Sequence, residues 1–309
     1  MPNSTMKAVC THDYGNADQL QLENIPLPAP GPGQVRVRLL SAGVNPADWK
    51  MRSGHYQRFM PLHFPWTPGL EGAGVVDQIG AGVVGFQPGQ PVLGAFNGAY
   101  AEYAIAAAED LVAKPEKLSY EEAASIPVGA LTAWQALEDT GLQPGQRLLV
   151  QGGAGGVGMY VVQLAVARGI DVIATASGAN LEFVRSLGAD EVIDYTTQDF
   201  AEVVHDVDAV IDTVGGEVME RSWPTLKPDG ILITIVSMLT PEQAQAHGKR
   251  GKRSGRAPAA ALQPIVALIE AGQVKPAISR VFPLAEAADA QRMSETGHGR
   301  GRIVLHIAG

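Results

Sequence analysis

A glycine-rich stretch in the middle of the chain has the residue types and spacing that bind phosphate groups. It places Gly153, Gly155 and Gly158 in the pattern G-x-G-x-x-G. In this pattern the first glycine permits a tight turn, the second lets the backbone approach a pyrophosphate, and the third lets a helix pack closely on a strand. Free N–H groups at the start of that helix favour an anion. The residues predicted to bind a dinucleotide here are Gly153, Ala154, Gly155, Gly156, Val157 and Gly158.

The segments around this turn predict the elements that hold it. The apolar run 147–150 is typical of a strand, and 159–167 is typical of a helix. Further apolar runs alternate with helix-like segments downstream, and those predicted as strands are 172–176, 191–195, 209–212 and 231–236. Near-continuous apolar strands separated by helices indicate a parallel sheet that is covered on both faces.

The N-terminal third has a different character, with short strand-like runs divided by glycine and proline. This pattern predicts a small barrel or sandwich. Helical signals begin later, where Ser119 and Glu122 have the spacing of a capping box. Further predicted elements are helices at 131–139, 181–187, 265–271 and 284–295 and a last strand at 302–307. The region 240–261 is predicted to be irregular and locally basic.

The composition is that of an ordinary globular protein with two domains. The chain has 309 residues, of which 46% are hydrophobic and 18% are charged, and this length is large for one core. The net charge of −9 speaks against nucleic acid or an anionic membrane as partner, because both require a basic surface. The single cysteine, Cys10, fits a reducing compartment, and no segment has the pattern of a signal peptide or a membrane span. We therefore expect a cytoplasmic protein that binds neither nucleic acid nor membrane.

Several segments together resemble one protein family. They are 42–50, 68–76, the glycine turn, 187–195 and 301–305, and they resemble the zinc-independent quinone oxidoreductases of the medium-chain dehydrogenase/reductase superfamily in content and in order. The resemblance implies an α/β fold, in which a Rossmann dinucleotide-binding domain with a parallel sheet is joined to a chaperonin-10-like (GroES-like) β-barrel catalytic domain. We expect residues 1–122 and 273–309 to form the catalytic domain and residues 123–272 the Rossmann domain.

The residues at the positions of the family's zinc ligands cannot bind a metal. Zinc-dependent relatives have cysteine or histidine where this chain, by resemblance, has Val44-Asn45, Leu70 and the neighbourhood of Ala130-Leu131. One cysteine also excludes a structural cysteine cluster. The sequence therefore predicts no metal.

The end of the second predicted strand of the Rossmann domain indicates NADPH as the cofactor. Folds specific for NAD carry an aspartate or glutamate there, which binds the ribose 2′-hydroxyl, and this chain has none. Ser177 and Asn180 can donate hydrogen bonds to a 2′-phosphate, and Tyr195 reaches the same group by resemblance. Arg185 or Arg302 would have to supply a positive charge. The alternative is that Ser177 and Asn180 only cap the next helix.

The chemistry expected without a metal is hydride transfer to a quinone or an α,β-unsaturated ketone. Such an acceptor delocalises the incoming negative charge, so that hydrogen-bond donors and a proton suffice. By resemblance Asn45 lies beside the nicotinamide and the acceptor, and Asp48 on the same loop and Tyr56 beyond it are further catalytic candidates. The structural alternatives are a turn at Asn45-Pro46, a surface pair of Asp48 with Lys50, and an exposed aromatic at Tyr56.

Other residues are predicted to contact the nicotinamide half of the cofactor. Thr132 resembles the family's threonine on that side, although a hydroxyl there can also cap a helix. Val214, Val236 and Ser237 follow two predicted strands, at the edge of the sheet where a dinucleotide rests. Glu71 is expected to hold the site together rather than to transfer a proton.

The leading hypothesis is an NADPH-dependent reductase of quinones or enones. One alternative is a zinc-independent alcohol dehydrogenase acting on saturated substrates. Another is a non-catalytic sensor or structural protein that binds NADPH and touches RNA through the basic segment 249–256. The resemblance also implies a homodimer, but the segment 254–261, where the family has its pairing strand, contains no β-branched residue.

Overall fold

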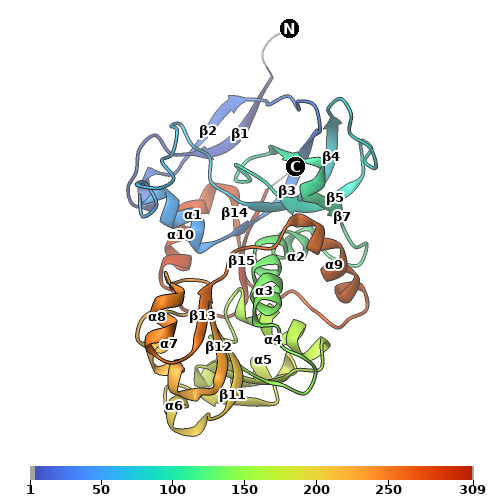
Figure 1. Cartoon of the computed structure of the whole chain (residues 1–309). Coiled ribbons are helices and arrows are strands. Elements are labelled where there is room, and N and C mark those ends of the chain that lie inside the picture. The colour runs from blue at the N-terminus through green and yellow to red at the C-terminus, as the bar shows by residue number, and fades with distance from the viewer. Residues whose placement is uncertain (1–3, 308–309) are drawn as a thin grey trace. The chain divides into compact units, whose positions relative to one another are not determined.

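Two compact units make up the protein, whose computed structural model describes residues 4–307 (Figure 1). Unit 1 contains the chain up to Val128, the segment Pro276–His298 and the stretch from Arg302 onward. Unit 2 contains Gly129–Lys275 and the short segment Gly299–Gly301. Within residues 4–307, every helix is too short or too polar to cross a lipid bilayer.

Unit 2 is built on a sheet of six parallel strands. In spatial order they are β10 (Glu191–Asp194), β9 (Asp171–Ala176), β8 (Arg147–Gln151), β11 (Val207–Asp212), β12 (Leu226–Thr234) and β13 (Arg250–Arg253). Side chains of the central strands, such as Leu149, Val210 and Leu232, are fully buried. The predicted parallel sheet is therefore confirmed, and its apolar strands require cover on both faces.

Helices supply this cover on the two sides of the sheet (Figure 1). One set is α3 (Pro127–Thr140), α4 (Gly158–Ala167) and α5 (Leu181–Ser186), and the other is α6 (Phe200–Val203), α7 (Gly216–Ser222) and α8 (Pro241–Ala246). Helix α9 (Leu262–Glu270) follows β13 along the chain. The strand order changes direction between β8 and β11, and the carboxyl edge at such a point is where open α/β sheets bind ligands.

The region 240–261 is more regular than predicted. It contains α8, where the Thr240 hydroxyl accepts the N–H of Gln243, and β13, which pairs in parallel with β12. The sequence Arg-Gly-Lys-Arg of β13 has no apolar residue, because an edge strand forms from backbone pairing and needs no buried face. The prediction of an irregular region was therefore wrong, since it relied on apolar patterning alone.

Unit 1 consists mainly of antiparallel strands. In one sheet the order is β14 (Ile278–Pro283), β15 (Arg302–His306), β3 (Gln34–Val44), β4 (Glu71–Ile79), β5 (Pro91–Ala95) and β7 (Leu111–Ala113), with β6 (Tyr103–Ala107) also paired to β3. A separate pair is formed by β1 (Thr5–Cys10) and β2 (Gln21–Pro26). The many short strands that the sequence predicted for this part are present.

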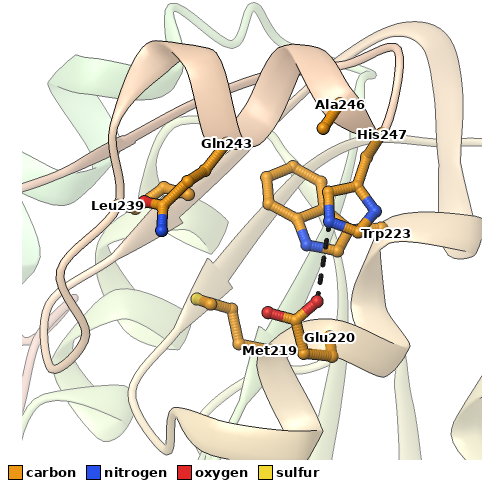
Figure 2. A pocket seen from close by; sticks show the side chains of 7 residues that line it. All are labelled: Met219, Glu220, Trp223, Leu239, Gln243, Ala246 and His247. Carbon is orange, nitrogen blue, oxygen red and sulfur yellow. Dashed lines mark ion pairs between the residues drawn. The ribbon is translucent and has the colours of Figure 1, made fainter.

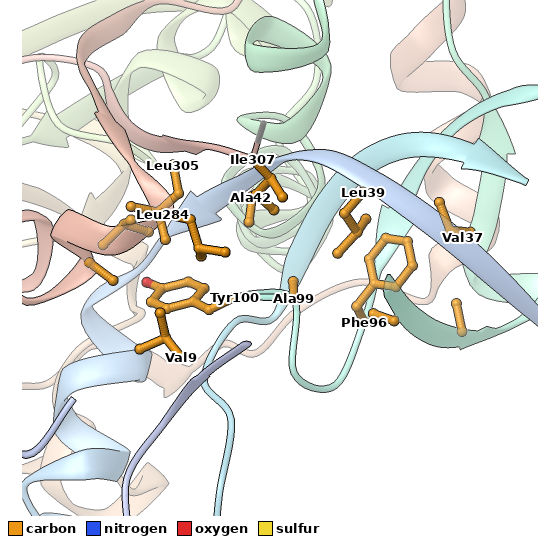
Figure 3. Packing of buried hydrophobic residues seen from close by; sticks show 14 of the residues in the cluster. Val9, Val37, Leu39, Ala42, Phe96, Ala99, Tyr100, Leu284, Leu305 and Ile307 are labelled. Atoms are coloured by element: carbon orange, nitrogen blue, oxygen red, sulfur yellow. The ribbon is translucent and has the colours of Figure 1, made fainter. Parts of the chain in front are cut away.

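The core of unit 1 gathers residues from both ends of the chain. Figure 3 shows the Tyr100 ring near Leu284 and Leu305, with Leu39 and Phe96 farther along the same cluster. The helices of this unit are α1 (Pro46–Arg52), α2 (Tyr120–Ala124) and α10 (Ala287–Glu295). The predicted capping box at α2 is confirmed, because the Ser119 hydroxyl accepts the N–H of Glu122 at 3.1 Å.

The segment after Asn45 is a helix and not the predicted loop. Asn45 has an extended backbone and is the N-cap of α1, and Pro46 occupies the first helical position. Proline is favoured there because its missing N–H would have no partner in the helix. Asn45 and Asp48 are thus held by regular structure.

Candidate functional site

The glycine turn of unit 2 connects β8 to α4 with very little space around two of its glycines. A Cβ atom on Gly158 would lie 2.1 Å from the carbonyl oxygen of Gly152, and a Cβ on Gly153 would lie 2.9 Å from the Cβ of Ala174. At Gly155 the nearest atom, the Gly152 oxygen, would be 3.3 Å away. Close packing therefore requires glycine at 153 and 158, whereas a Cβ at 155 would meet one atom at a tight but much less severe distance.

The same turn presents backbone amides that the protein does not use. Gly153 N–H donates to the Thr175 carbonyl at 2.9 Å, which ties the turn to the end of β9. By contrast, the N–H groups of Gly156 and Val157 donate no hydrogen bond to any residue within 4–307. Both precede α4, where unpaired N–H groups and the helix dipole attract anions. This arrangement fits the pyrophosphate of a dinucleotide.

Three predicted cofactor residues lie at the carboxyl ends of two neighbouring strands. Asp194 of β10 pairs with Ala176 of β9, so Tyr195 and Ser177 follow adjacent strand ends. The Asn180 amide donates to the Ser177 hydroxyl at 3.0 Å. Neither side chain caps its helix, so the capping alternative is not what the structure shows.

A carboxylate also lies at this position, contrary to prediction. It belongs to Asp194 on the neighbouring strand, and a Cβ on Gly178 would lie 2.8 Å from its Oδ2 atom. Hydrogen bonds from the Thr196 hydroxyl at 2.6 Å and the Thr196 N–H at 2.9 Å hold the pKa of Asp194 below its ordinary value. The sequence search covered only the end of β9, and it missed a charge that strand pairing brings beside it.

A positive charge that the sequence analysis missed lies beside α5, the helix that follows Ser177 and Asn180. Arg302 belongs to unit 1, and Arg185 forms an ion pair with Glu182. Arg300, in the short segment of unit 2, lies over the Phe183 ring of α5 at 5.6 Å. The next residue, Gly301, donates its N–H to the carbonyl of Ala154 in the glycine turn at 2.8 Å. Arg300 is exposed and forms no ion pair within the described part of the chain.

The ends of β11 and β12 present apolar side chains on a rigid base. Buried Asp212 accepts the N–H groups of Val214 at 3.0 Å and Gly215 at 2.8 Å, and the Thr234 hydroxyl at 2.8 Å. Val214 is 51% exposed and Val236 is 40% exposed. Two fixed and exposed valines at this edge suit the flat face of a nicotinamide. The predicted Ser237 follows directly, and its N–H donates to the Thr234 hydroxyl at 3.2 Å.

A cavity in unit 2 lies apart from these residues (Figure 2). Its volume is about 220 Å³, and His247 stacks on the Trp223 ring beside it and pairs with Glu220 at 3.5 Å. Small-molecule sites usually measure roughly 300–1,000 Å³. None of the predicted cofactor residues lines this cavity, so we do not assign the dinucleotide to it.

In unit 1, Asn45 lies in a buried cluster with two charged residues. Its amide nitrogen donates to Glu71 Oε1 at 2.8 Å, and its amide oxygen accepts from Arg302 at 2.8 Å. Arg302 also forms an ion pair with Glu71, whose other oxygen accepts the N–H of Val128 at 2.7 Å. Asn45, Glu71 and Arg302 are all at most 4% exposed. The orientation of the Asn45 amide is therefore fixed at both ends, and one amide hydrogen remains to be donated.

Asp48 lies beneath this cluster and not at the surface with Lys50. It is fully buried, and its Oδ2 atom accepts the Asn45 N–H at 2.8 Å and the Tyr100 hydroxyl at 3.1 Å. Burial raises its pKa to about 7, against the opposing effect of these hydrogen bonds. Asp48 therefore holds the backbone of Asn45 through a buried hydrogen bond.

The two remaining candidates lie in different units. Tyr56 follows α1 in unit 1 and is half-buried, and its hydroxyl forms no hydrogen bond with residues 4–307. Thr132 is half-buried in α3 of unit 2. Tyr56 thus has a free polar group, as the predicted proton donor requires.

The donor atoms of this site do not fit zinc. Both oxygens of Glu71 are engaged, and Arg302 beside it would repel a cation. Among residues 4–307, no group of three or more His, Cys, Asp or Glu side chains could hold a metal ion. Zinc requires such a set of nitrogen, sulfur or carboxylate ligands.

Two family models match the chain, one in each half. The model of the alcohol dehydrogenase GroES-like domain matches residues 31–116. The model described as zinc-binding dehydrogenase matches residues 187–305. The second description names zinc, whereas the side chains described above provide no ligand set for it.

The chain resembles other proteins over nearly its whole length. It is 37% identical to 2-methylene-furan-3-one reductase of Solanum lycopersicum, over 98% of this chain and 79% of that protein. It is 33% identical to the chloroplast envelope quinone oxidoreductase homolog of Arabidopsis thaliana, over 99% of both. The structure of the quinone oxidoreductase from Coxiella burnetii matches with a TM-score of 0.91 and 33% identity, over 99% of this chain and 100% of that chain. These matches confirm the predicted fold of a GroES-like domain with a Rossmann-type domain, and the chain belongs to the quinone oxidoreductase family of the medium-chain dehydrogenase/reductase superfamily.

Proposed function

We propose that the protein is an NADPH-dependent reductase that transfers a hydride to quinones or α,β-unsaturated carbonyl compounds without a metal. The observation that carries the proposal is the glycine turn, whose Gly156 and Val157 amides are unused at the start of α4. Two relatives support the acceptor class, since one is named a furanone reductase and another a quinone oxidoreductase homolog. When bound, the reduced nicotinamide supplies the hydride.

The preference for NADPH rests on the side chains around the end of β9. Ser177, Asn180 and Tyr195 offer hydrogen-bond donors, and Arg300 offers an unpaired positive charge. Asp194 opposes them, because its ionised carboxylate repels a 2′-phosphate. We propose that the four favourable groups together outweigh this one charge. The remaining cofactor contacts are assigned to Thr132, Val214, Val236 and Ser237.

The acceptor is assigned to Asn45 and Tyr56. Asn45 has one amide hydrogen left to donate to an acceptor oxygen, and its orientation is fixed by Glu71 and Arg302. A preorganised donor of this kind stabilises negative charge as it develops on oxygen. A quinone or enone spreads that charge over several atoms, so the site needs no Lewis acid. The free Tyr56 hydroxyl supplies the proton.

No observation favours the other functions weighed from the sequence. A saturated ketone or alcohol gains most from a metal, and the donor atoms here do not fit one. The basic segment 249–256 is largely engaged within unit 2, since Lys249 donates to the carbonyls of Leu226 and Lys227 and Lys252 pairs with Asp139. We further propose a cytoplasmic location, on the ground of the single cysteine, and a homodimer.

The test measures oxidation of NADPH, with NADH in parallel, by protein that has been treated with a chelator. An ortho-quinone and a short-chain enone serve as acceptors. We expect turnover that favours NADPH and is unchanged by the chelator. Activity lost with the metal would overturn the metal-free mechanism, and tight NADPH binding without turnover would overturn the reductase in favour of the sensor.

A further inference from the structure

A chain of buried polar side chains in unit 1 begins at Arg52, the last residue of α1. Arg52 is 1% exposed. Its Nε atom donates to Gln291 Oε1 of α10 at 2.7 Å, and its Nη1 atom donates to the carbonyl of Gly15 at 2.5 Å. Its remaining nitrogen forms an ion pair with Glu295 at the end of α10. Arg52 thus fixes α1 to two other segments of the same unit.

Further buried polar groups lie between α10 and Asn45. The Tyr100 ring packs in the same core cluster as Ala287 and Ala290 of α10, the helix that carries Gln291. The Gln291 Nε2 atom is buried without a hydrogen-bond partner among residues 4–307. The Tyr100 hydroxyl donates to Asp48 Oδ2 at 3.1 Å, and the same oxygen accepts the N–H of Asn45 at 2.8 Å. Figure 3 shows the Tyr100 ring held between Val9 and Leu284.

The burial of these polar side chains lowers the stability of the fold. Gln291, Tyr100 and Asp48 are all fully buried, and Arg52 is nearly so. Removing a charged side chain from water carries a large penalty, and apolar residues of similar size often give equal or greater stability. The chain of polar groups is therefore poorly explained by stability, and it ends at the residue that we assign to the acceptor.

We propose that four buried side chains are positioning residues that set the location of the Asn45 amide; they are Arg52, Gln291, Tyr100 and Asp48. This inference rests on the proposed role of Asn45 as a donor to the acceptor oxygen. Arg52 holds the last turn of α1 and Asp48 holds its first turn. The helix that carries Asn45 can then neither rotate nor slide, and a displacement of about 1 Å at a reacting group can cost roughly 100-fold in rate.

The central experiment compares Tyr100→Phe with Tyr103→Phe. The first change removes the hydroxyl that donates to Asp48 and keeps the ring in the core. The second is a matched control on β6, where the Tyr103 ring lies beneath Arg36 at 5.8 Å and takes no part in the polar chain. We expect kcat with a quinone to fall about tenfold in Tyr100→Phe, with an unchanged Kd for NADPH. Tyr103→Phe should stay within about twofold of the parent. Equal kcat values for the two variants would overturn the proposal.

Combination with Asn45→Ala separates positioning from a general loss of structure. Because Tyr100 is proposed to act through Asn45, the double variant should be no slower than Asn45→Ala alone. Effects of independent sites would multiply instead, and multiplied effects would overturn the proposal. Gln291→Leu should lower kcat like Tyr100→Phe, and Gln291→Glu should restore it, because glutamate keeps the acceptor for Arg52.

A readout without turnover keeps this test separate from the proposed function. Amide hydrogen exchange across residues 45–52 should be faster in Tyr100→Phe than in Tyr103→Phe. If Asn45→Ala has full activity, the proposed role of Asn45 fails whatever the exchange rates show. If Asn45→Ala is slow while Tyr100→Phe has a normal kcat, the positioning inference alone fails.

Discussion

Arg302 and Glu71 form a buried ion pair across 231 residues of sequence, with side chains that are 4% and 0% exposed. Arg302 opens the last strand described and Glu71 opens β4. Their pairing fixes the Asn45 amide between them. Because neither partner reaches water, removal of one leaves the other as an uncompensated buried charge.

We therefore expect Arg302→Met to destabilise the protein by about 3–5 kcal/mol. Denaturant unfolding followed in unit 1, with Arg36→Met as the control, measures this loss. Arg36 pairs with Asp77 at a position where the side chains are 14% and 32% exposed, and its removal should cost about 1 kcal/mol or less. Equal losses for the two variants would contradict the account of the buried pair.

Asp48→Asn should change how stability depends on pH. The pKa of Asp48 is about 7 in the folded protein, against an ordinary value of 3.8, so the folded state retains a proton that the unfolded state releases. Stability contributed by this group therefore falls as pH rises from about 4 to about 7, by roughly 4 kcal/mol in all. Asparagine does not titrate, and it keeps an oxygen for the Asn45 N–H and the Tyr100 hydroxyl.

Melting temperatures of the two proteins at pH 5 and pH 8 provide the measurement. The parent should lose more stability over this interval than Asp48→Asn, and every other titrating group is common to both. Identical pH dependence would refute the raised pKa. Retention of kcat in Asp48→Asn would further indicate that Asp48 positions Asn45 and is not the proton donor.

The two glycines of the turn should respond differently to alanine. In Gly158→Ala the new Cβ would meet the Gly152 oxygen at 2.1 Å, so we expect a loss of about 1–3 kcal/mol or more in stability. In Gly155→Ala the nearest atom is 3.3 Å away, so the fold should persist while the pyrophosphate is excluded. The Kd for NADPH should then rise by roughly tenfold or more. Normal NADPH binding by a folded Gly155→Ala protein would argue against the assigned phosphate site.

Arg300 and Asp194 should shift the cofactor preference in opposite directions. Arg300→Ala is expected to raise the Kd for NADPH about tenfold, since it removes a charged hydrogen-bond donor, and to leave NADH binding nearly unchanged. Asp194→Asn should lower the Kd for NADPH about two- to fivefold, because water screens the charge of this half-buried carboxylate. Arg185→Ala, on the same helix as Phe183 but paired with Glu182, is the control. Parallel changes for NADPH and NADH would show that neither residue senses the 2′-phosphate.

The sequence predicted best those features that depend on local spacing. Gly153, Gly155 and Gly158 identified the turn because each glycine has its own steric reason, and the apolar runs of β8, β9 and β11 identified the parallel sheet. The helix α1 was missed although Asn45, Pro46 and Asp48 carry the signals of a helix start, since the segment has few apolar residues. Strand β13 was missed because an exposed edge strand has no apolar pattern to detect.

Features that depend on pairing between distant segments could not be read in this way. Asp194 lies beside Gly178 only because β10 pairs with β9, and Gly301, which follows Arg300, meets the glycine turn only through its hydrogen bond to Ala154. The partners of Asn45 are Glu71 of β4 and Arg302 of β15, and nothing in the sequence indicates that these two charged residues are in contact. Which charged side chains surround a site depends on such contacts between distant segments, and the spacing of residues along the sequence does not reveal them.

The path of the chain between the two units has a consequence for biosynthesis. Unit 2 is almost entirely one continuous segment, whereas unit 1 requires β15, which lies between β14 and β3 in its sheet. The ribosome makes β15 only after all of unit 2. Domains generally fold as they emerge, so the dinucleotide-binding unit can form during translation. At that stage β3, which is followed by Asn45, does not yet have its pairing partner β15. A nascent chain stalled before residue 302 would contain a folded unit 2 and, in unit 1, a β3 strand that lacks β15; an unpaired strand edge of this kind is a template for aggregation.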